Sequence, residues 1–196
     1  MNVSRLISSQ GLVFVLGGLP VLAVAMHSMG FIHIVTSLMI IGFTFAFTFG
    51  LFSHTLNTKR ILKFWLLGWV AVGVYDSSRI AFILAGWDDF IPGLGGWLTD
   101  TSENFWLGYL WRYAGNGGGL AVSFLMLSTL FNFKRNVFSG LLFGLGVFTC
   151  LETVLITSSQ AQENMFPLCA LTFCGGLIGH VLYGITLGWL ADKLTD

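Results

Sequence analysis

Long apolar runs dominate this chain and restrict what it can fold into. A helix needs about 20 predominantly apolar residues to cross the hydrocarbon core of a bilayer. Only 9% of the 196 residues are charged, whereas about a quarter are charged in a soluble domain. We therefore predict an all-α integral membrane protein, one compact domain over residues 1–196 that bundles six transmembrane helices. The runs that meet the required length lie at about 11–30, 32–53, 61–87, 104–131, 137–157 and 165–191.

The basic residues outside these runs indicate the orientation of the chain. With the N-terminus in the cytoplasm, all of them fall on the cytoplasmic side, as the positive-inside rule requires. This arrangement also places the C-terminus in the cytoplasm, and we expect the inner membrane of a bacterium. We expect the run 11–30 to be retained as the first span and not to be a cleaved signal peptide. The residues that set the orientation are Arg5, Lys59, Arg60, Lys63, Lys134, Arg135 and Lys193.

Ionisable residues inside the predicted spans are the second unusual feature. Asp76 and Arg79 lie three residues apart in the third span, so on a helix they share a face. Arg112 lies in the fourth span, Glu152 in the fifth and His180 in the last. A charged side chain at that depth is costly unless it is paired or hydrated, and it is expected to face the bundle interior.

Further polar residues adjoin these ionisable groups. Tyr75 precedes Asp76, Tyr113 follows Arg112, and Asn116 lies four residues after Arg112, on the same face of an α-helix. The predicted topology brings most of these groups into the outer half of the membrane, with His180 nearer the middle. We predict that the ligand-binding residues are Tyr75, Asp76, Arg79, Arg112, Tyr113, Asn116, Glu152 and His180.

Two accounts of this polar cluster stay open. In the first, Arg79 and Arg112 contact a small polar or anionic molecule in a periplasm-facing cavity, and the molecule is bound or passed across the membrane. Asp76 and Glu152 are then counter-charges or proton carriers. In the second, the two acids and two arginines form a salt-bridge network that fixes helix register, and the chain is a non-catalytic subunit of a larger membrane complex. A third hypothesis, an enzyme acting on a lipid headgroup, has no catalytic signature in its favour.

Two glycine-rich segments carry structural expectations. The longest loop, 88–103, combines glycines with large apolar residues, which favours an interfacial connector over a lid across a cavity. The run 115–119 consists of glycines and one asparagine inside a span. It predicts close helix packing, a kink, or local unwinding that exposes backbone carbonyls.

The histidines and cysteines give little support for a metal or cofactor. No two histidines lie at matching depth in two spans, as haem b requires, so haem is not favoured. His27 and His33 flank the tip of the first helical hairpin and are weak candidates for a metal. The three cysteines are expected to be small buried apolar residues. A net charge of zero gives no footprint for nucleic acid. The expected partners are the lipid bilayer, a small-molecule ligand, and a membrane-protein partner or a second copy of the chain.

Overall fold

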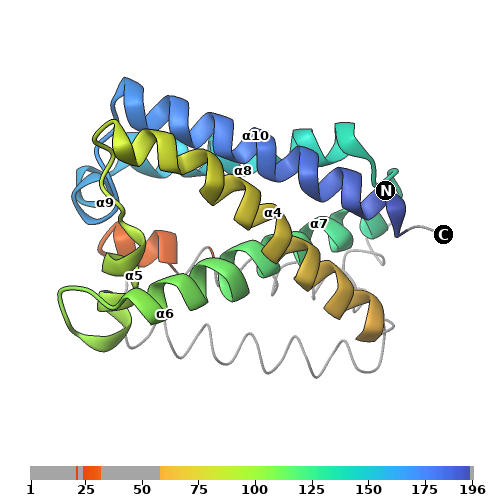
Figure 1. The fold of residues 1–196 in the computed structure, drawn as a ribbon, viewed down its shortest axis with the longest axis horizontal. Helices are drawn as coiled ribbons and strands as arrows, with labels where there is room; N and C mark the ends of the chain where they lie inside the picture. Colours follow the sequence, from red (N-terminus) through yellow and green to blue (C-terminus); the bar gives the residue numbers. More distant parts are fainter. Residues whose placement is uncertain (1–20, 22–23, 32–57, 195–196) are drawn as a thin grey trace.

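The computed structural model of the chain describes residues 21, 24–31 and 58–194. Every regular element in these residues is helical (Figure 1), which confirms the predicted all-α class for this part of the chain. The predicted spans 11–30 and 32–53 lie outside the described residues, apart from 21 and 24–31.

In the described ranges, three helices are long and apolar enough to cross a membrane. They are α4 (Thr58–Leu84), α8 (Val137–Thr157) and α10 (Ala170–Lys193), and they correspond to the predicted spans 61–87, 137–157 and 165–191. Large apolar side chains remain exposed on all three, as expected of helices that contact lipid. The fold therefore fits an integral membrane protein. Exposed examples are Leu66, Val70, Leu142, Ile156 and Trp189.

The fourth predicted span, 104–131, is helical but not uniformly α-helical. It consists of α6 (Phe105–Leu110), a π-helical segment η1 (Trp111–Gly117) and α7 (Gly118–Leu130), and the backbone keeps right-handed helical angles at both junctions. The helix type thus changes within the glycine-rich run 115–119. Short π-helical segments inside α-helices are often found at functional sites.

Side chains of two neighbouring helices bond to the carbonyls of η1. Trp65 of α4 donates its indole N–H to the Ala114 carbonyl at 2.9 Å, and the Tyr183 hydroxyl of α10 donates to the Gly117 carbonyl at 2.8 Å. The expected exposure of carbonyls in this run therefore serves helix packing.

Helix α4 occupies the centre of the described bundle. It packs against α10 on one side and against η1 and α7 on the other, while α8 packs against α10 (Figure 1). The buried core between these helices includes Phe64 and Val72 of α4, Phe124 of α7, and Leu187 of α10. Any group buried on α4 is therefore within reach of two other membrane-length segments.

Glycines allow α8 and α10 to approach closely. A Cβ added at Gly144 would collide with the His180 carbonyl oxygen, and one at Gly140 would collide with the Gly184 carbonyl oxygen. In a bilayer, where no hydrophobic effect drives helices together, small residues of this kind are what permits tight packing.

The two connectors that contain the short helices α5 and α9 lie at the same end of the bundle. α5 (Ile91–Thr99) and α9 (Ser159–Asn164) lie there, where α4 and α8 end and α10 begins (Figure 1). The segment 24–31 lies at the same end, because Asn164 donates to the Ser28 carbonyl at 2.9 Å and the His27 ring lies 5.2 Å from that of Trp97.

The segment 88–103 is a packed helix and not an irregular loop. Ile91 and Leu94 of α5 are buried, and α5 contacts α6 so closely that a Cβ at Gly108 would collide with the Ile91 carbonyl oxygen. On the α5 side, a Cβ at Gly95 would collide with the Asn104 carbonyl oxygen and the Gly108 backbone nitrogen, so these two glycines permit the contact.

Two sequence expectations require correction. α10 begins at Ala170, not 165, because Cys169 and Thr172 form a capping box that starts the helix; Phe166 instead packs in a buried cluster with Trp87. The cysteines Cys150, Cys169 and Cys174 are free but exposed, not buried.

The α8–α10 contact can be tested with two glycines of one helix. Gly144→Ala should lower the free energy of unfolding by about 1–3 kcal/mol, the usual range for overpacking, because its methyl group would meet the His180 carbonyl. Gly146→Ala is the control, since a Cβ there meets nothing within 4 Å. SDS-induced unfolding in mixed micelles measures both, and equal effects would show that the close contact is absent.

Candidate functional site

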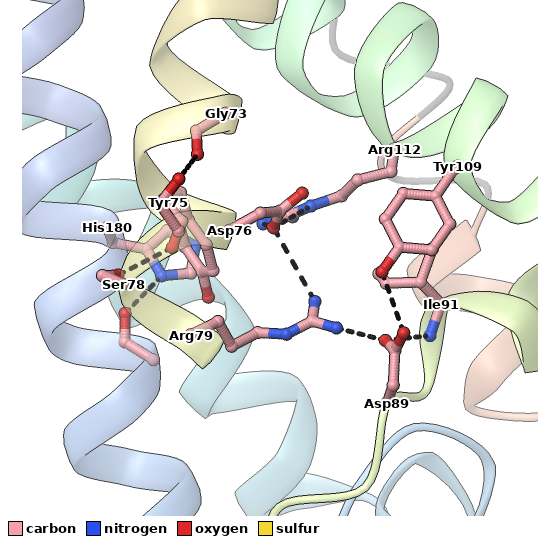
Figure 2. Close-up of polar contacts among 12 residues, drawn as sticks. Gly73, Tyr75, Asp76, Ser78, Arg79, Asp89, Ile91, Tyr109, Arg112 and His180 are labelled. Carbon is pink, nitrogen blue, oxygen red and sulfur yellow. Dashed lines mark hydrogen bonds and ion pairs between the residues drawn. The ribbon is translucent and has the colours of Figure 1, made fainter. Parts of the chain in front are cut away.

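Asp76 is the centre of a buried group of ion pairs (Figure 2). Arg112 of η1 donates from Nε and Nη2 to Oδ1 of Asp76, at 3.1 and 2.8 Å. Nη1 of Arg79 lies 3.8 Å from the same oxygen, and the Arg79 and Arg112 side chains are only 2% and 7% exposed. One carboxylate oxygen thus serves two almost fully buried guanidinium groups.

The second carboxylate of the group belongs to Asp89, in the connector between α4 and α5. It forms an ion pair with Nη2 of Arg79, and it accepts hydrogen bonds from the Tyr109 hydroxyl at 2.9 Å and the Ile91 backbone N–H at 3.2 Å (Figure 2). We call Asp76, Arg79, Asp89 and Arg112 the arginine cluster. It joins α4, the connector, α6 and η1.

Sequence reasoning missed Asp89 and Tyr109. Asp89 was placed in the outer loop, yet the chain reverses directly after α4, at Gly86, whose φ of 107° lies in the region that favours glycine. That reversal returns Asp89 to Arg79, ten residues earlier in the chain. The signal available in the sequence was a glycine followed by two aspartates at the end of a span that contains an arginine.

Aromatic rings cover both guanidinium groups. The Arg79 guanidinium carbon lies 5.6 Å from the centroid of the Trp87 ring and 5.3 Å from that of Phe90. The corresponding distance from Arg112 to the Tyr75 ring is 4.3 Å. Cations are attracted to the faces of such rings, more strongly when water is excluded, so the rings stabilise both buried guanidinium groups.

Several buried polar atoms of this region have no hydrogen-bond partner among the described residues. They are Nε and Nη1 of Arg79, Oδ2 of Asp76 and the indole nitrogen of the adjoining Trp87. Most buried polar groups in folded proteins are hydrogen-bonded, and the exceptions call for a missing water, ion or ligand. The arginine cluster therefore has unused donors and an unused acceptor side by side.

Glu152 does not join the arginine cluster. It lies on α8, which packs against α10 and not against α4, and its Oε1 is directed toward Gly176, where an added Cβ would lie 3.9 Å away. Glu152 is only 6% exposed, and within the described part of the chain neither of its carboxyl oxygens has a hydrogen-bond partner.

His180 and Tyr75 connect the arginine cluster to α10. The His180 ring lies edge-on to Tyr75, with centroids 5.0 Å apart, and its Nδ1 is 2.8 Å from the Gly176 carbonyl oxygen. Tyr75 in turn stacks on Arg112. Among the predicted binding residues these two therefore contact or adjoin the site, although neither hydrogen-bonds to its carboxylates.

Asn116 and Tyr113 are not brought into the arginine cluster by any hydrogen bond that the structure shows. Asn116 is half-buried, and the Tyr113 ring lies 6.0 Å from that of Trp69. The expectation for Asn116 assumed the period of an α-helix. In the π-helical turn of η1 a residue four positions on still lies on nearly the same face, so the helix type does not account for the position of Asn116.

The described residues contain no group of three or more His, Cys, Asp or Glu side chains that could hold a metal. His27 lies against Trp97, and His33, the other weak candidate, lies outside the described residues.

The described residues define a class: a helical membrane-type fold in which three helices reach membrane-spanning length and arginines and aspartates form a buried, charge-balanced cluster. No protein-family model, curated protein or solved structure matches the chain.

Neutralising two carboxyl groups inside the bundle should have effects of different size. Asp76→Asn leaves Arg112 without a carboxylate partner among the described residues and should lower the free energy of unfolding by about 3–5 kcal/mol. Glu152→Gln replaces a group without a partner by one of the same shape and should change it by less than about 1 kcal/mol. Thermal or SDS unfolding of the purified chain measures both. A large loss in Glu152→Gln would show that Glu152 is paired in the folded protein.

Proposed function

We propose that the chain binds or passes a small polar or anionic molecule at the arginine cluster, which opens toward the outer face of the membrane. The observation that carries the proposal is that Nε and Nη1 of Arg79 and Oδ2 of Asp76 have no hydrogen-bond partner in the part of the chain that the structure describes. A network that only held helices together would be expected to satisfy its buried donors and acceptors, whereas a ligand with a negatively charged oxygen would take up the free N–H groups of Arg79.

We also propose that the protein lies in the bacterial inner membrane with six spans and both termini in the cytoplasm. The segment α6–η1–α7 contains 26 residues in a continuous helical path. At about 1.5 Å per residue this path is about 39 Å long, enough for a hydrocarbon core of about 30 Å. The positive-inside rule supports the orientation, because basic residues flank the start of α4, the α7–α8 connector and the end of α10.

The orientation predicts which connectors an impermeant reagent can reach. After the native cysteines are replaced by serine, Ser102→Cys, near the start of α6, should react with a membrane-impermeant maleimide on intact spheroplasts. Lys134→Cys, in the α7–α8 connector, should react only after permeabilisation. Both parent side chains are exposed in the fold, so burial does not limit the reaction. The reverse pattern would contradict the orientation, and equal reaction would contradict a fourth span.

Within the arginine cluster, Asp89 is the side chain that a ligand would displace most easily. Its side chain is 28% exposed, against 2% for Arg79, and it lies on a connector and not on a membrane-length helix. A ligand carboxylate or phosphate that replaced it would meet the same three donors, Arg79, Tyr109 and the Ile91 N–H. Charged partners of this kind form the stronger hydrogen bonds. Asp89 is thus an internal carboxylate that occupies the position of an anionic ligand.

The second candidate is a non-catalytic subunit of a membrane complex. The observation in its favour is the charge balance of the arginine cluster, in which two aspartates neutralise two arginines. In this case the ion pairs hold α4 to the connector and to η1, and no anion should replace Asp89.

Two neighbouring aspartates distinguish these candidates. Asp89→Asn removes the carboxylate that faces Arg79, and we expect this variant to bind acetate or inorganic phosphate at least about tenfold more tightly than the wild type, equivalent to 1.4 kcal/mol. The control is Asp88→Asn, because Asp88 is exposed and the substitution changes net charge equally. Isothermal titration calorimetry and anion-dependent thermal shifts of the purified chain are the measurements.

A third variant tests whether the anion binds to Arg79. Combining Arg79→Gln with Asp89→Asn should abolish the gain in anion binding. If Asp89→Asn is merely less stable, and neither acetate nor phosphate binds to it more tightly than to Asp88→Asn, the ligand-binding proposal is wrong and the subunit candidate is supported.

A further inference from the structure

The other end of the bundle contains a second arginine site, remote in sequence from the arginine cluster. Arg135 lies between the end of α7 and the start of α8. Its Nη1 is within hydrogen-bond distance of the Ser128 hydroxyl at 3.2 Å and the Thr129 hydroxyl at 3.5 Å. The side chain is half-buried, and its Nε is buried without a hydrogen bond. The guanidinium group is therefore held against the end of α7 and does not extend freely into water.

A second positive charge acts on Arg135. Burial and the charge of Arg60, in the first turn of α4, both lower the pKa of Arg135. In the described part of the chain, neither arginine forms an ion pair with a carboxylate. A like charge nearby disfavours the charged form of a guanidinium group, and an anion beside Arg135 would offset this effect.

The sequence itself supplies few anions for this end. Residues 1–57 contain no Asp or Glu, and the only acidic residues near the predicted cytoplasmic end are Asp192 and Asp196. The basic residues there include Lys63, Lys134 and Lys193 in addition to the two arginines. The neutralising group must therefore come largely from outside the chain.

The surroundings of Arg135 indicate which kind of anion this is. The same connector and the first turn of α8 expose large apolar side chains, which would contact acyl chains while Arg135 meets the headgroup. Arginine suits phosphate because its planar N–H groups match two phosphate oxygens, and basic pockets between membrane helices bind anionic headgroups in this way. The exposed apolar side chains are Phe131, Phe133, Val137 and Phe138.

We propose that Arg60 and Arg135, at the joined ends of α4, α7 and α8, bind the phosphate of an anionic phospholipid headgroup at the membrane interface. The site uses no residue of the arginine cluster, so it stands or falls independently of ligand binding there.

The test compares two adjacent basic residues in the full chain. Native mass spectrometry of the detergent-solubilised protein measures retention of dioleoyl-phosphatidylglycerol and, as the uncharged reference, dioleoyl-phosphatidylcholine. We expect the wild type to retain phosphatidylglycerol in preference, and Arg135→Gln to weaken that retention roughly fivefold or more. Lys134→Gln is the matched control, because Lys134 is exposed and the substitution removes the same charge; it should change retention less than about twofold.

Further measurements keep the proposal falsifiable if Arg135→Gln folds poorly. Arg60→Gln should also weaken phosphatidylglycerol retention, and Arg135→Lys, which keeps the charge but not the planar group, should weaken it partly. Equal losses in Lys134→Gln and Arg135→Gln would show diffuse attraction and overturn the proposal. So would equal retention of the two lipids by the wild type. If inorganic phosphate protects the protein from heat as well as phosphatidylglycerol does, and only when Arg135 is present, the site takes free phosphate and the lipid assignment is wrong.

Discussion

The described fold depends on one carboxylate held between two arginines in a place that water barely reaches. Asp76 accepts two hydrogen bonds from Arg112 and faces Arg79 across 3.8 Å. Each arginine would be very costly to bury alone, and the mutual attraction of the three charges offsets that cost only while the geometry is kept. Because Asp76 lies on α4, Arg112 on η1 and the partner of Arg79 on the connector, this requirement fixes three separate parts of the chain relative to one another.

Other features of the fold follow from the same requirement. Aromatic rings of Tyr75, Trp87 and Phe90 cover the guanidinium faces where carboxylates do not reach. The connector returns Asp89 to Arg79 and then continues as α5, which packs onto α6 through Gly95. Among the described residues, Nε and Nη1 of Arg79 have no hydrogen-bond partner. The proposed binding function rests on these donors, because an oxygen anion could bond to them without displacing water from the guanidinium group.

The membrane-length helices could be predicted from the sequence, because local composition determines them. The partners of the buried side chains could not, because contacts between helices determine them. α4, α8 and α10 were predictable because length and hydropathy alone mark a span. The pairing of Asp76 and Arg79 was predictable from their spacing on one helix face. Glu152 was expected in the same group because depth in the membrane was the only guide, whereas the packing of α8 on α10 decides its surroundings. The π-helical segment η1 was not predictable, because nothing in the composition of the glycine run distinguishes a π-helical turn from an α-helical one.

The central claim, that Asp76 and Arg112 act as one coupled buried pair, is tested most directly by a double-mutant cycle. The free energy of unfolding in SDS mixed micelles would be measured for Asp76→Asn, Arg112→Gln, their combination and the wild type. We predict a coupling energy of about 2 kcal/mol, within the range for contacting residues, so that the double variant is more stable than the sum of the single effects implies. Strict additivity would show that the two side chains do not depend on each other and would contradict the account.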